Sequence, residues 1–364
     1  MKFLQLVSSY AEYGRDFLAQ NPDFSSRSYA EQNARLVEDG YSLVHLFGRY
    51  LGAHGFESQI VFTDIEPAQK QWLKENGLSV RRPEHWRHEI AAHQVNAAKP
   101  DVLYITEPVG FDRRFLELLD PKPRLILGWK AAAIPEGTDW RDFDVILSNF
   151  MPTVARAREL GARDTAFIIP GFPEKLADEL PDEGKFLDVS FIGSVSSEHP
   201  TRNAYLEFLA RSTVTNRDGF ELGYYIRTAE PHLVPPAVKA RNRGALWGRG
   251  MYRALKGSRI AINIGIDLAK GETGNMRMIE ATGLGTFLLT EHKDNIRDYF
   301  EPGVEIETFT SQAELEAKVR YFLHHEDKRE AIAARGRARC LRDFSMERSL
   351  GQLIGIIRQH LPEI

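Results

Sequence analysis

The sequence predicts an α/β protein with two domains, each built on a parallel sheet. Short apolar runs alternate with amphipathic helical segments along its 364 residues, a pattern typical of parallel strands covered by helices. The alternation is interrupted between Pro170–Pro173 and Asp182–Gly184, where proline, glycine and charged residues cluster. We therefore expect an N-terminal domain over residues 1–175, a C-terminal domain over 185–345 and a final helix over 346–364. In open sheets of this kind, ligands bind beyond the carboxyl ends of the strands, so we expect a cleft between the two carboxyl edges.

The composition excludes several classes of protein. The chain is 43% hydrophobic and 27% charged, so each half can bury a core. Its net charge of −4 argues against a general nucleic-acid-binding protein. The single cysteine, Cys340, excludes an internal disulfide and a cysteine-built metal site. No apolar run approaches the roughly 20 residues of a membrane span, and residues 3–7 are too short for a signal-peptide core. We expect a cytoplasmic protein with at most peripheral membrane contact.

In the first half, six apolar runs predict strands. They are residues 3–7, 60–63, 102–105, 125–127, 145–147 and 166–169. Apolar residues spaced three to four apart over 43–51 predict a long helix between the first two strands. Residues 8–30 are polar and rich in serine and tyrosine, which favours a long loop after the first strand.

The second half repeats the pattern. Its predicted strands are residues 188–192, 221–226, 245–247, 259–264, 286–289 and 305–309. Ser311 and Glu314 have the spacing of a capping box for the next helix. Apolar residues on one face after Ser345 predict the last helix.

Residues 271–290 contain the strongest candidate binding site. Gly271 and Gly274 bracket a loop that can approach a bulky ligand, and residues 275–282 predict a short helix whose N-terminus favours anions. Arg277 can bind a phosphate through two hydrogen bonds, and Glu280, on the same helical face, can accept both hydroxyls of a ribose. The alternative is an ordinary turn in which Arg277 and Glu280 pair with each other on the surface.

The turn after residue 192 is a second candidate. Gly193 and Ser194 leave the backbone accessible at the end of a predicted strand, and Arg202 begins the next helical region. These residues can approach the sugar or the phosphates of a ligand, with Arg202 supplying positive charge. The alternative is an ordinary tight turn between a strand and a helix.

Residues 239–259 carry seven basic residues and no acidic one. Such a run is usually a solvated face. It can also attract an anionic donor or contact acidic lipid headgroups at a membrane surface. Trp247, beside a glycine in this run, can flank a nucleobase.

Two other groups resemble metal sites but do not have the required spacing. Asp142 and Asp144 form an Asp-x-Asp, but they precede the strand over 145–147, whereas the metal-binding pair of sugar transferases ends a strand. His88 and His93 would point about 140° apart on a helix. We therefore expect no metal site here.

The C-terminal half resembles glycosyltransferases related to the spore-maturation protein CgeB, in the group 1 glycosyl transferases. The resemblance rests on residues 275–280, 283–290, 300–305 and 313–323, and extends loosely over 100–175. It implies the GT-B fold: two Rossmann-like domains with a deep interdomain cleft and a C-terminal helix that packs back toward the first domain. The family usually closes its last motif with His-Thr-Tyr, whereas Asp343-Phe344-Ser345 stands here.

The resemblance also implies a nucleotide-sugar donor in the second domain. Glu280 would bind the ribose, Asn275 and Arg277 would lie at the diphosphate, and Asn263 would line the same pocket. With Gly193, Ser194, Arg202, Trp247 and Gly274, these residues form the predicted donor site.

We expect a metal-independent glycosyltransferase that uses no cofactor. The acceptor hydroxyl would belong to a glycan, a lipid-linked saccharide or a protein. Arg277 would stabilise the departing phosphate. Glu107, at the end of a first-domain strand, is the candidate base, followed by Asp64; each is also a candidate loop-capping carboxylate. The alternatives are a nucleotide-sugar epimerase or hydrolase, and a non-catalytic partner subunit.

Overall fold

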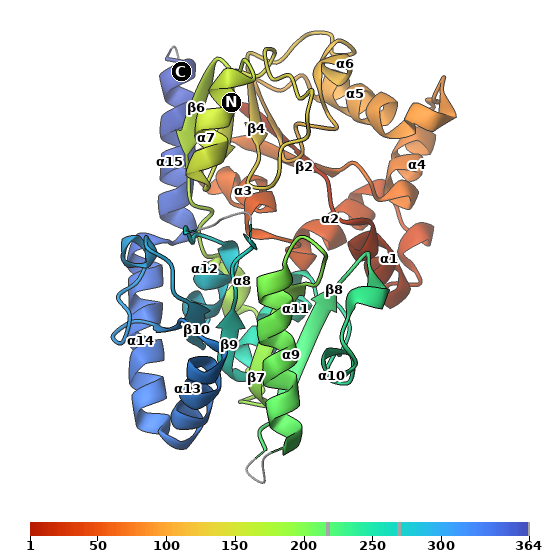
Figure 1. The fold of residues 1–364 in the computed structure, drawn as a ribbon. Coiled ribbons are helices and arrows are strands. Elements are labelled where there is room, and N and C mark those ends of the chain that lie inside the picture. The colour runs from red at the N-terminus through yellow and green to blue at the C-terminus, as the bar shows by residue number, and fades with distance from the viewer. Residues whose placement is uncertain (216–218, 268–270, 363–364) are drawn as a thin grey trace. The chain divides into compact units, whose positions relative to one another are not determined.

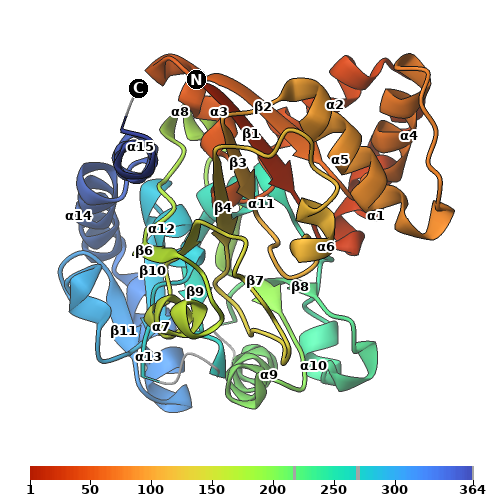
Figure 2. The same cartoon turned by 90° about the horizontal axis from the view of Figure 1, so that it is seen from above.

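A computed structural model describes residues 1–215, 219–267 and 271–362. The chain divides into two compact units. The first comprises residues 1–170 and 347–364, and the second comprises residues 171–346. Each unit holds one parallel sheet with helices packed against it (Figures 1 and 2). The α/β class with two Rossmann-like sheets is therefore confirmed.

The first unit has a six-stranded sheet in the order β2-β1-β3-β4-β5-β6, and every neighbouring pair is parallel. The strands are β1 (Lys2–Val7), β2 (Glu57–Phe62), β3 (Val102–Ile105), β4 (Leu125–Trp129), β5 (Val145–Ser148) and β6 (Asp164–Phe167). Each overlaps one of the six apolar runs. The inner strands β3, β4 and β5 are buried at every position, as expected for a sheet covered on both faces.

The helices of this unit are α1 (Ala11–Gln20), α2 (Tyr29–Asp39), α3 (Phe47–Tyr50), α4 (Glu66–Glu75), α5 (Trp86–Ala98), α6 (Arg113–Leu116), α7 (Met151–Glu159) and α15 (Met346–His360). From Glu347 onward, α15 belongs to the first unit. Ser349 Oγ of α15 donates a 2.8 Å hydrogen bond to the Ile169 carbonyl. His360 Nε2 lies 3.3 Å from the Asp164 carboxylate.

Two predictions for this unit are wrong. Residues 8–30 contain α1 and the start of α2 rather than a long loop. Helix α1 buries Tyr13 and Phe17, which are four residues apart, and Ser28 and Glu31 form a capping box that starts α2. The long helix over residues 43–51 is broken into short turns. The buried Gln5 amide accepts from Gly48 N–H at 2.8 Å and donates to the Val44 carbonyl at 3.0 Å. These two backbone groups would otherwise bond to each other in an α-helix.

The second unit has a five-stranded parallel sheet in the order β11-β10-β9-β7-β8. The strands are β7 (Leu187–Ser194), β8 (Leu222–Arg227), β9 (Ser258–Asn263), β10 (Phe287–Glu291) and β11 (Glu307–Phe309). The predicted strand over residues 245–247 is absent. Asn242 instead forms an isolated bridge with Tyr224 of β8, and Gly244, at φ 91°, turns the chain away.

The helices of the second unit are α8 (Glu174–Asp178), α9 (Pro200–Thr215), α10 (Pro236–Lys239), α11 (Gly248–Lys256), α12 (Met276–Gly283), α13 (Gln312–His324) and α14 (Glu326–Asp343). Ile260 and Ile262 of β9 point into a core shared with Leu206 of α9 and Val319 of α13. The alternate residue Asn263 therefore faces the other side of the sheet. At the start of α13, Ser311 accepts from Glu314 N–H, but the Glu314 carboxylate bonds to Thr310, so only half of the predicted capping box forms.

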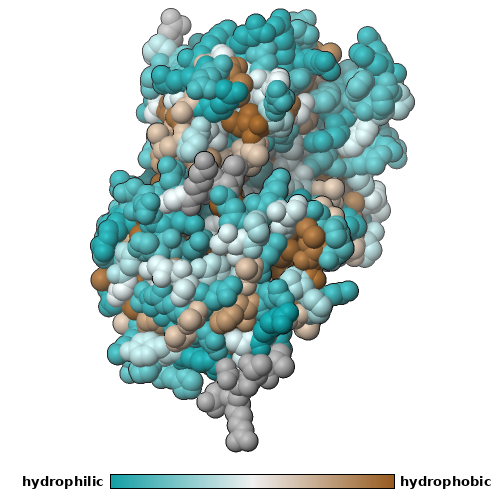
Figure 3. Space-filling view, in the orientation of Figure 1, coloured by the Kyte–Doolittle hydropathy of each residue, from teal (hydrophilic) through white to brown (hydrophobic). Residues whose placement is uncertain are grey.

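The face of the molecule in Figure 3 carries mainly hydrophilic side chains, with small separate groups of hydrophobic ones. Large exposed apolar side chains such as Tyr10, Leu78, Met151 and Tyr321 come from distant segments of the sequence. Scattered exposed apolar residues of this kind are normal for a globular protein.

We predict that Gly336→Ala destabilises the second unit. A Cβ on Gly336, in α14, would lie 2.2 Å from the Glu305 carbonyl oxygen, a backbone atom that a rotamer change cannot move. Overpacking of this kind costs about 1–3 kcal/mol. Denaturant unfolding should therefore show a lower midpoint for this variant. The matched control is Gly351→Ala in α15, where a Cβ meets nothing within 4 Å. An equal midpoint shift in both variants would contradict this close contact.

Candidate functional site

The strand order of the second sheet places its topological switch point between β7 and β9. From this pair, the chain runs outward to β8 on one side and to β10 on the other. Ligands of open α/β sheets bind beyond the carboxyl ends of two such strands. Gly193 and Ser194 end β7, and Asn263 ends β9. Three of the predicted site residues therefore lie at this switch point.

Arg202 of α9 connects the two strand ends. Its Nη1 donates to the carbonyl and the hydroxyl oxygen of Ser194, both at 3.2 Å, and its Nη2 donates to the Ile264 carbonyl at 3.0 Å. Arg202 is only 5% exposed, and this burial lowers its pKa to about 10, against the attraction of Asp267 and Glu291. Its buried Nε has no hydrogen-bond partner in the described part of the chain. Because a pKa of about 10 lies well above neutral pH, the guanidinium is a cation at the switch point.

A chain of amide hydrogen bonds continues the site across β9. Asn263 Nδ2 donates to Thr290 Oγ1 of β10 at 2.9 Å, and Asn275 Nδ2 donates to Asn263 Oδ1 at 2.8 Å. Asn275 Oδ1 is buried and has no hydrogen-bond partner among the described residues. A buried acceptor of this kind is costly unless a ligand or water satisfies it.

Arg277 and Glu280 lie on α12, which begins directly after Asn275. Arg277 Nη1 donates to Glu280 Oε2 at 2.6 Å and to Met251 Sδ of α11 at 2.9 Å. The pair therefore forms, but not on the surface: the Glu280 side chain is 4% exposed and that of Arg277 is 16% exposed. Burial raises the pKa of Glu280 above its usual range, and the charge of Arg277 opposes that shift.

The loop before α12 is held by its neighbours. Thr273 N–H donates to Asn295 Oδ1 at 2.7 Å, and Asn295 Nδ2 donates to the Thr273 carbonyl at 3.0 Å. Gly274 has a φ of 143°, a conformation that favours glycine. The bond from Asn275 to Asn263 thus joins the end of β9 to Gly274, Asn275 and Arg277 at the start of α12.

The basic run over residues 239–259 is largely neutralised within the second unit. Four of its arginines form ion pairs: Arg243 with Glu221, Arg249 with Glu179, Arg253 with Glu183, and Arg259 with Asp188. These pairs reduce the positive charge with which the run could attract an anionic sugar donor or acidic lipid headgroups. Trp247 lies directly before α11, the helix whose Met251 contacts Arg277.

Glu107 and Asp64 belong to the first unit, and each has a local partner. Glu107 Oε2 accepts from Gly110 N–H at 2.5 Å, and its Oε1 lies 3.8 Å from Lys130 Nζ. Asp64 Oδ2 accepts from the Ser9 N–H at 2.6 Å and from its hydroxyl at 2.8 Å. Burial raises the pKa of Asp64, and the bonds from Ser9 oppose this. Both carboxylates act as loop caps in this conformation.

Asp142 and Asp144 lie before β5, as the sequence predicts, and have structural partners. Asp144 accepts from Ile126 N–H at 2.7 Å and from Arg163 Nη1 at 2.7 Å. Asp142 lies 3.6 Å from Arg113. No group of three or more His, Cys, Asp or Glu in the described ranges is arranged to hold a metal ion.

Sequence reasoning missed Thr290, Asn295 and Met251, which hold Asn263, the residue 271–274 loop and Arg277 in place. Thr290 is the last residue of the segment 283–290 that carries the family resemblance and lies next to the last residue of β10, and this position was the available signal. Asn295 and Met251 gave none, because their contacts depend on tertiary packing. None of the helices in the described segments is both long and apolar enough to span a membrane.

The solved structures that the chain resembles share its fold. A glycosyltransferase from Rickettsia africae ESF-5 matches with a TM-score of 0.59 at 12% identity, over 100% of this chain and 99% of its own. Anabaena HepE in complex with UDP-glucose matches with a TM-score of 0.61 at 11% identity, over 99% and 100%. Sucrose-phosphate synthase from Thermosynechococcus elongatus matches with a TM-score of 0.58 at 11% identity, over 100% of both chains. The chain therefore has the GT-B fold.

A comparison of the sequence with protein-family models finds a match for part of the chain. Residues 202–355 match the family model described as glycosyl transferase-like. This segment includes Arg202, Asn263, Asn275, Arg277 and Glu280. No curated protein matches the chain in sequence. The match thus covers most of the second unit, with these candidate site residues inside it, and the first part of α15.

Proposed function

We propose that this protein transfers a sugar from a nucleotide-sugar donor to an acceptor hydroxyl. The observation that carries the proposal is the set of Arg202, Asn263, Asn275 and Arg277 at and beside the switch point of the second sheet. Cations and amides at this edge suit a nucleotide diphosphate. The glycosyl transferase-like match covers the same residues, and the similar HepE structure contains UDP-glucose.

In this proposal, each residue binds one part of the donor. Glu280 accepts the ribose hydroxyls, and Asn275 bonds to the diphosphate. Arg277 uses Nη1 to hold Glu280, and its buried Nε has no partner in the described structure. Arg202 adds a second cation. Negative charge develops on the phosphate as the glycosidic bond breaks, so these cations would stabilise the transition state more than the ground state.

The acceptor would be a glycan, a lipid-linked saccharide or a protein, and it would bind to the first unit. If the stereochemistry requires a base, Glu107 is our candidate, with Asp64 next. Each would have to exchange a bond to the Gly110 or Ser9 backbone for one to the acceptor hydroxyl. We place the activity in the cytoplasm, with any membrane contact peripheral and through residues 239–259.

The proposal is tested by incubating the purified chain with a panel of nucleotide sugars and measuring thermal stability. A ligand that binds only the native state raises the melting temperature. We expect stabilisation by one nucleotide class, and by its diphosphate alone. Product analysis with saccharide acceptors then separates transfer from epimerisation or hydrolysis, which need no acceptor. An absence of any shift across the panel would contradict the donor site.

We further predict that the transfer does not need a divalent cation. Arg202 and Arg277 can neutralise the leaving diphosphate without Mg²⁺ or Mn²⁺, which would themselves need carboxylate ligands beside it. Activity should therefore persist in excess EDTA. Asp142→Asn should leave donor affinity unchanged, since Asp142 contacts Arg113 in the first unit. Loss of turnover in EDTA that Mn²⁺ restores would show that metal takes part at the phosphate.

A further inference from the structure

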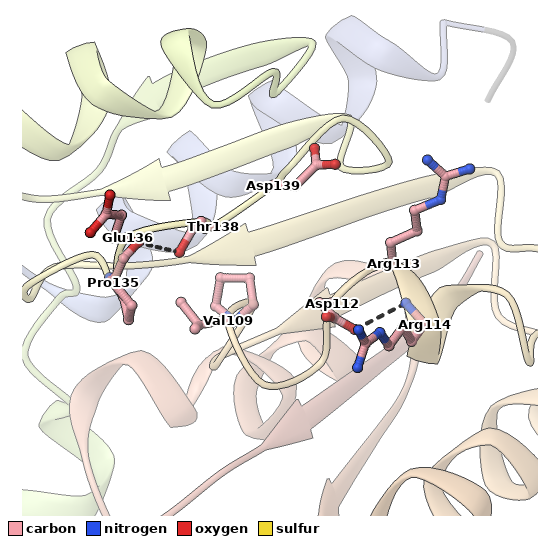
Figure 4. Close-up of a pocket in the computed structure, with 10 residues that line it drawn as sticks. Val109, Asp112, Arg113, Arg114, Pro135, Glu136, Thr138 and Asp139 are labelled. Carbon is pink, nitrogen blue, oxygen red and sulfur yellow. Dashed lines mark hydrogen bonds between the residues drawn. The ribbon is translucent and has the colours of Figure 1, made fainter.

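The first unit has a pocket of about 350 Å³ between the segments that follow β3 and β4. Arg114 and Glu136 lie on opposite sides of Val109 in this pocket (Figure 4), so they do not converge on one ligand. The two segments through which the chain enters and leaves the second unit make more specific contacts, and these contacts all lie within the second unit.

The chain crosses between the two units at two places that lie side by side. It enters the second unit at Gly171 and leaves it after Met346. Phe172 N–H donates to the Phe344 carbonyl at 2.7 Å, and Met346 N–H donates to the Phe172 carbonyl at 2.9 Å. A Cβ on Gly171 would lie 2.2 Å from the Ser345 carbonyl oxygen, so the two backbones are in direct contact. We call residues 171–173 the first connection and residues 344–346 the second connection.

The first connection packs against the end of α12. Phe172 is 1% exposed, and a Cβ on Gly283, the last residue of α12, would lie 2.3 Å from Cγ and Cδ2 of the Phe172 ring. The ring therefore lies directly on the backbone of the helix. Arg277 precedes Gly283 by six residues, about 9 Å along a helix axis. Because so short a helix moves as one body, a displacement of the ring would also displace Arg277 and Glu280.

The second connection supports the loop before α12. The buried ring of Phe344 stacks on Tyr299, with the ring centroids 5.9 Å apart. The short turn Ile296–Asp298 joins Tyr299 to Asn295. Asn295 holds the loop before α12 through its two hydrogen bonds to Thr273. Each connection thus supports a different part of the candidate site.

Helix α14 ends directly before the second connection and adds two bonds to α12. Cys340 Sγ donates to the Ile279 carbonyl at 3.4 Å, and Arg337 Nε donates to the Gly283 carbonyl at 3.3 Å. In a close-packed interior of this kind, a shift at one contact is transmitted to the next. The two connections, α14 and α12 therefore form one continuous packed group.

We propose that Phe172 and Phe344 are positioning residues for the donor site. Phe172 fixes the place of α12, and Phe344 fixes the place of the loop before it. A change at either connection thereby alters the affinity for the nucleotide. This inference rests on the proposed function for the word donor, but the positions of α12 and of the loop can be tested without a ligand.

The first test is amide hydrogen exchange on the ligand-free protein. Phe172→Leu should raise exchange in α12 about 10-fold, and Phe344→Leu should do the same over residues 271–275 and 293–300, because each segment loses its support and opens locally. The matched control is Phe322→Leu. Phe322 is also buried in the second unit, but its ring packs 4.5 Å from Phe287 at the start of β10, the end of the strand away from the candidate site. The control should leave both segments at their wild-type rates.

The second test is calorimetric titration of UDP, GDP, ADP and TDP at a temperature where all variants are folded. Phe172→Leu and Phe344→Leu should each weaken the binding of the preferred nucleotide about 10-fold, since a small misplacement of binding groups is enough for such a loss. Phe322→Leu should keep the wild-type affinity. A role in stability alone would lower the unfolding midpoint of all three variants and leave the affinity of the folded proteins unchanged.

A double-mutant cycle tests the contact between the ring and the helix. Gly283→Ala places a methyl group where the Phe172 ring lies, so it should also weaken nucleotide binding. In the Phe172→Ala protein, the same substitution should have no further effect, because the ring that it displaces is absent.

Equal exchange in the three leucine variants, or wild-type nucleotide affinity in both Phe172→Leu and Phe344→Leu, would overturn the inference. Failure of the donor proposal has a different result. A wild-type protein that binds none of the nucleotides contradicts the donor site, and the exchange rates then decide by themselves whether the two rings position α12 and its loop.

Discussion

Replacing Arg277 by lysine should lower kcat by about 10²-fold, the usual effect of removing one preorganised donor from a site of developing negative charge. Lysine keeps the charge but not the planar guanidinium, so it cannot hold Glu280 and bind a phosphate oxygen at the same time. In the structure, Nη1 of Arg277 already bonds to Glu280, and the remaining nitrogens of the guanidinium would serve the donor.

Steady-state kinetics with saturating donor measure this effect. The control is Arg297→Lys, because Arg297 is an exposed arginine of the same unit whose partner is Glu301, four residues further along the chain. That variant should keep the kcat of the wild-type enzyme. A kcat near the wild-type value in Arg277→Lys would show that the guanidinium makes no bond that strengthens in the transition state.

Glu280→Ala should have two separate consequences. Donor affinity should fall by about 1.5–3 kcal/mol, the value of a hydrogen bond to a charged group. The free energy of unfolding should also fall, by about 3 kcal/mol, because the mutation leaves the mostly buried Arg277 without its carboxylate partner. From the sequence, a surface glutamate in a helix could change to alanine without such a loss. Because Glu280 and Arg277 form a mostly buried ion pair, we no longer expect the Glu280→Ala protein to keep its wild-type stability.

Calorimetric titration of nucleotides and denaturant unfolding measure the two effects independently. Glu280→Gln separates them, since the glutamine oxygen can still accept from Arg277 while the negative charge is gone. Glu207→Ala, which breaks the pair of the half-buried Glu207 with the exposed Arg211, is the control and should change the unfolding free energy by less than about 1 kcal/mol. Unchanged nucleotide affinity in both Glu280 variants would exclude a role in ribose binding.

Much of the fold could be predicted, because buried strands leave a direct signal in the sequence. The runs at residues 102–105 and 259–264 are apolar since parallel strands between helices are buried on both faces. The failures come from contacts between residues that are far apart in the sequence. Gln5 reads as a polar interruption of β1, yet its amide separates Val44 from Gly48 and breaks a helix. No spacing rule predicts a side chain that acts across 39 residues of sequence.

The geometry of the candidate site could also be predicted only in part from the sequence. The three-residue spacing of Arg277 and Glu280 predicts that the two can meet, and they do. Their burial depends on how α12 packs in the fold, and so could not be read from spacing. The contact of Asn275 with Asn263 spans 12 residues and depends on where α12 begins relative to the end of β9. The bond from Arg202 to Ile264 spans 62 residues and depends on the order of the strands.

The most direct test of the central claim is a calorimetric titration of UDP, GDP, ADP and TDP into the wild-type protein and into Arg277→Lys. The claim is that the carboxyl edge of the second sheet binds a nucleoside diphosphate through Arg277 and its neighbours. We predict that at least one of these nucleotides binds the wild-type protein and that its affinity falls about 10-fold in the variant. Binding of none of the four, or equal affinity for both proteins, would contradict the claim.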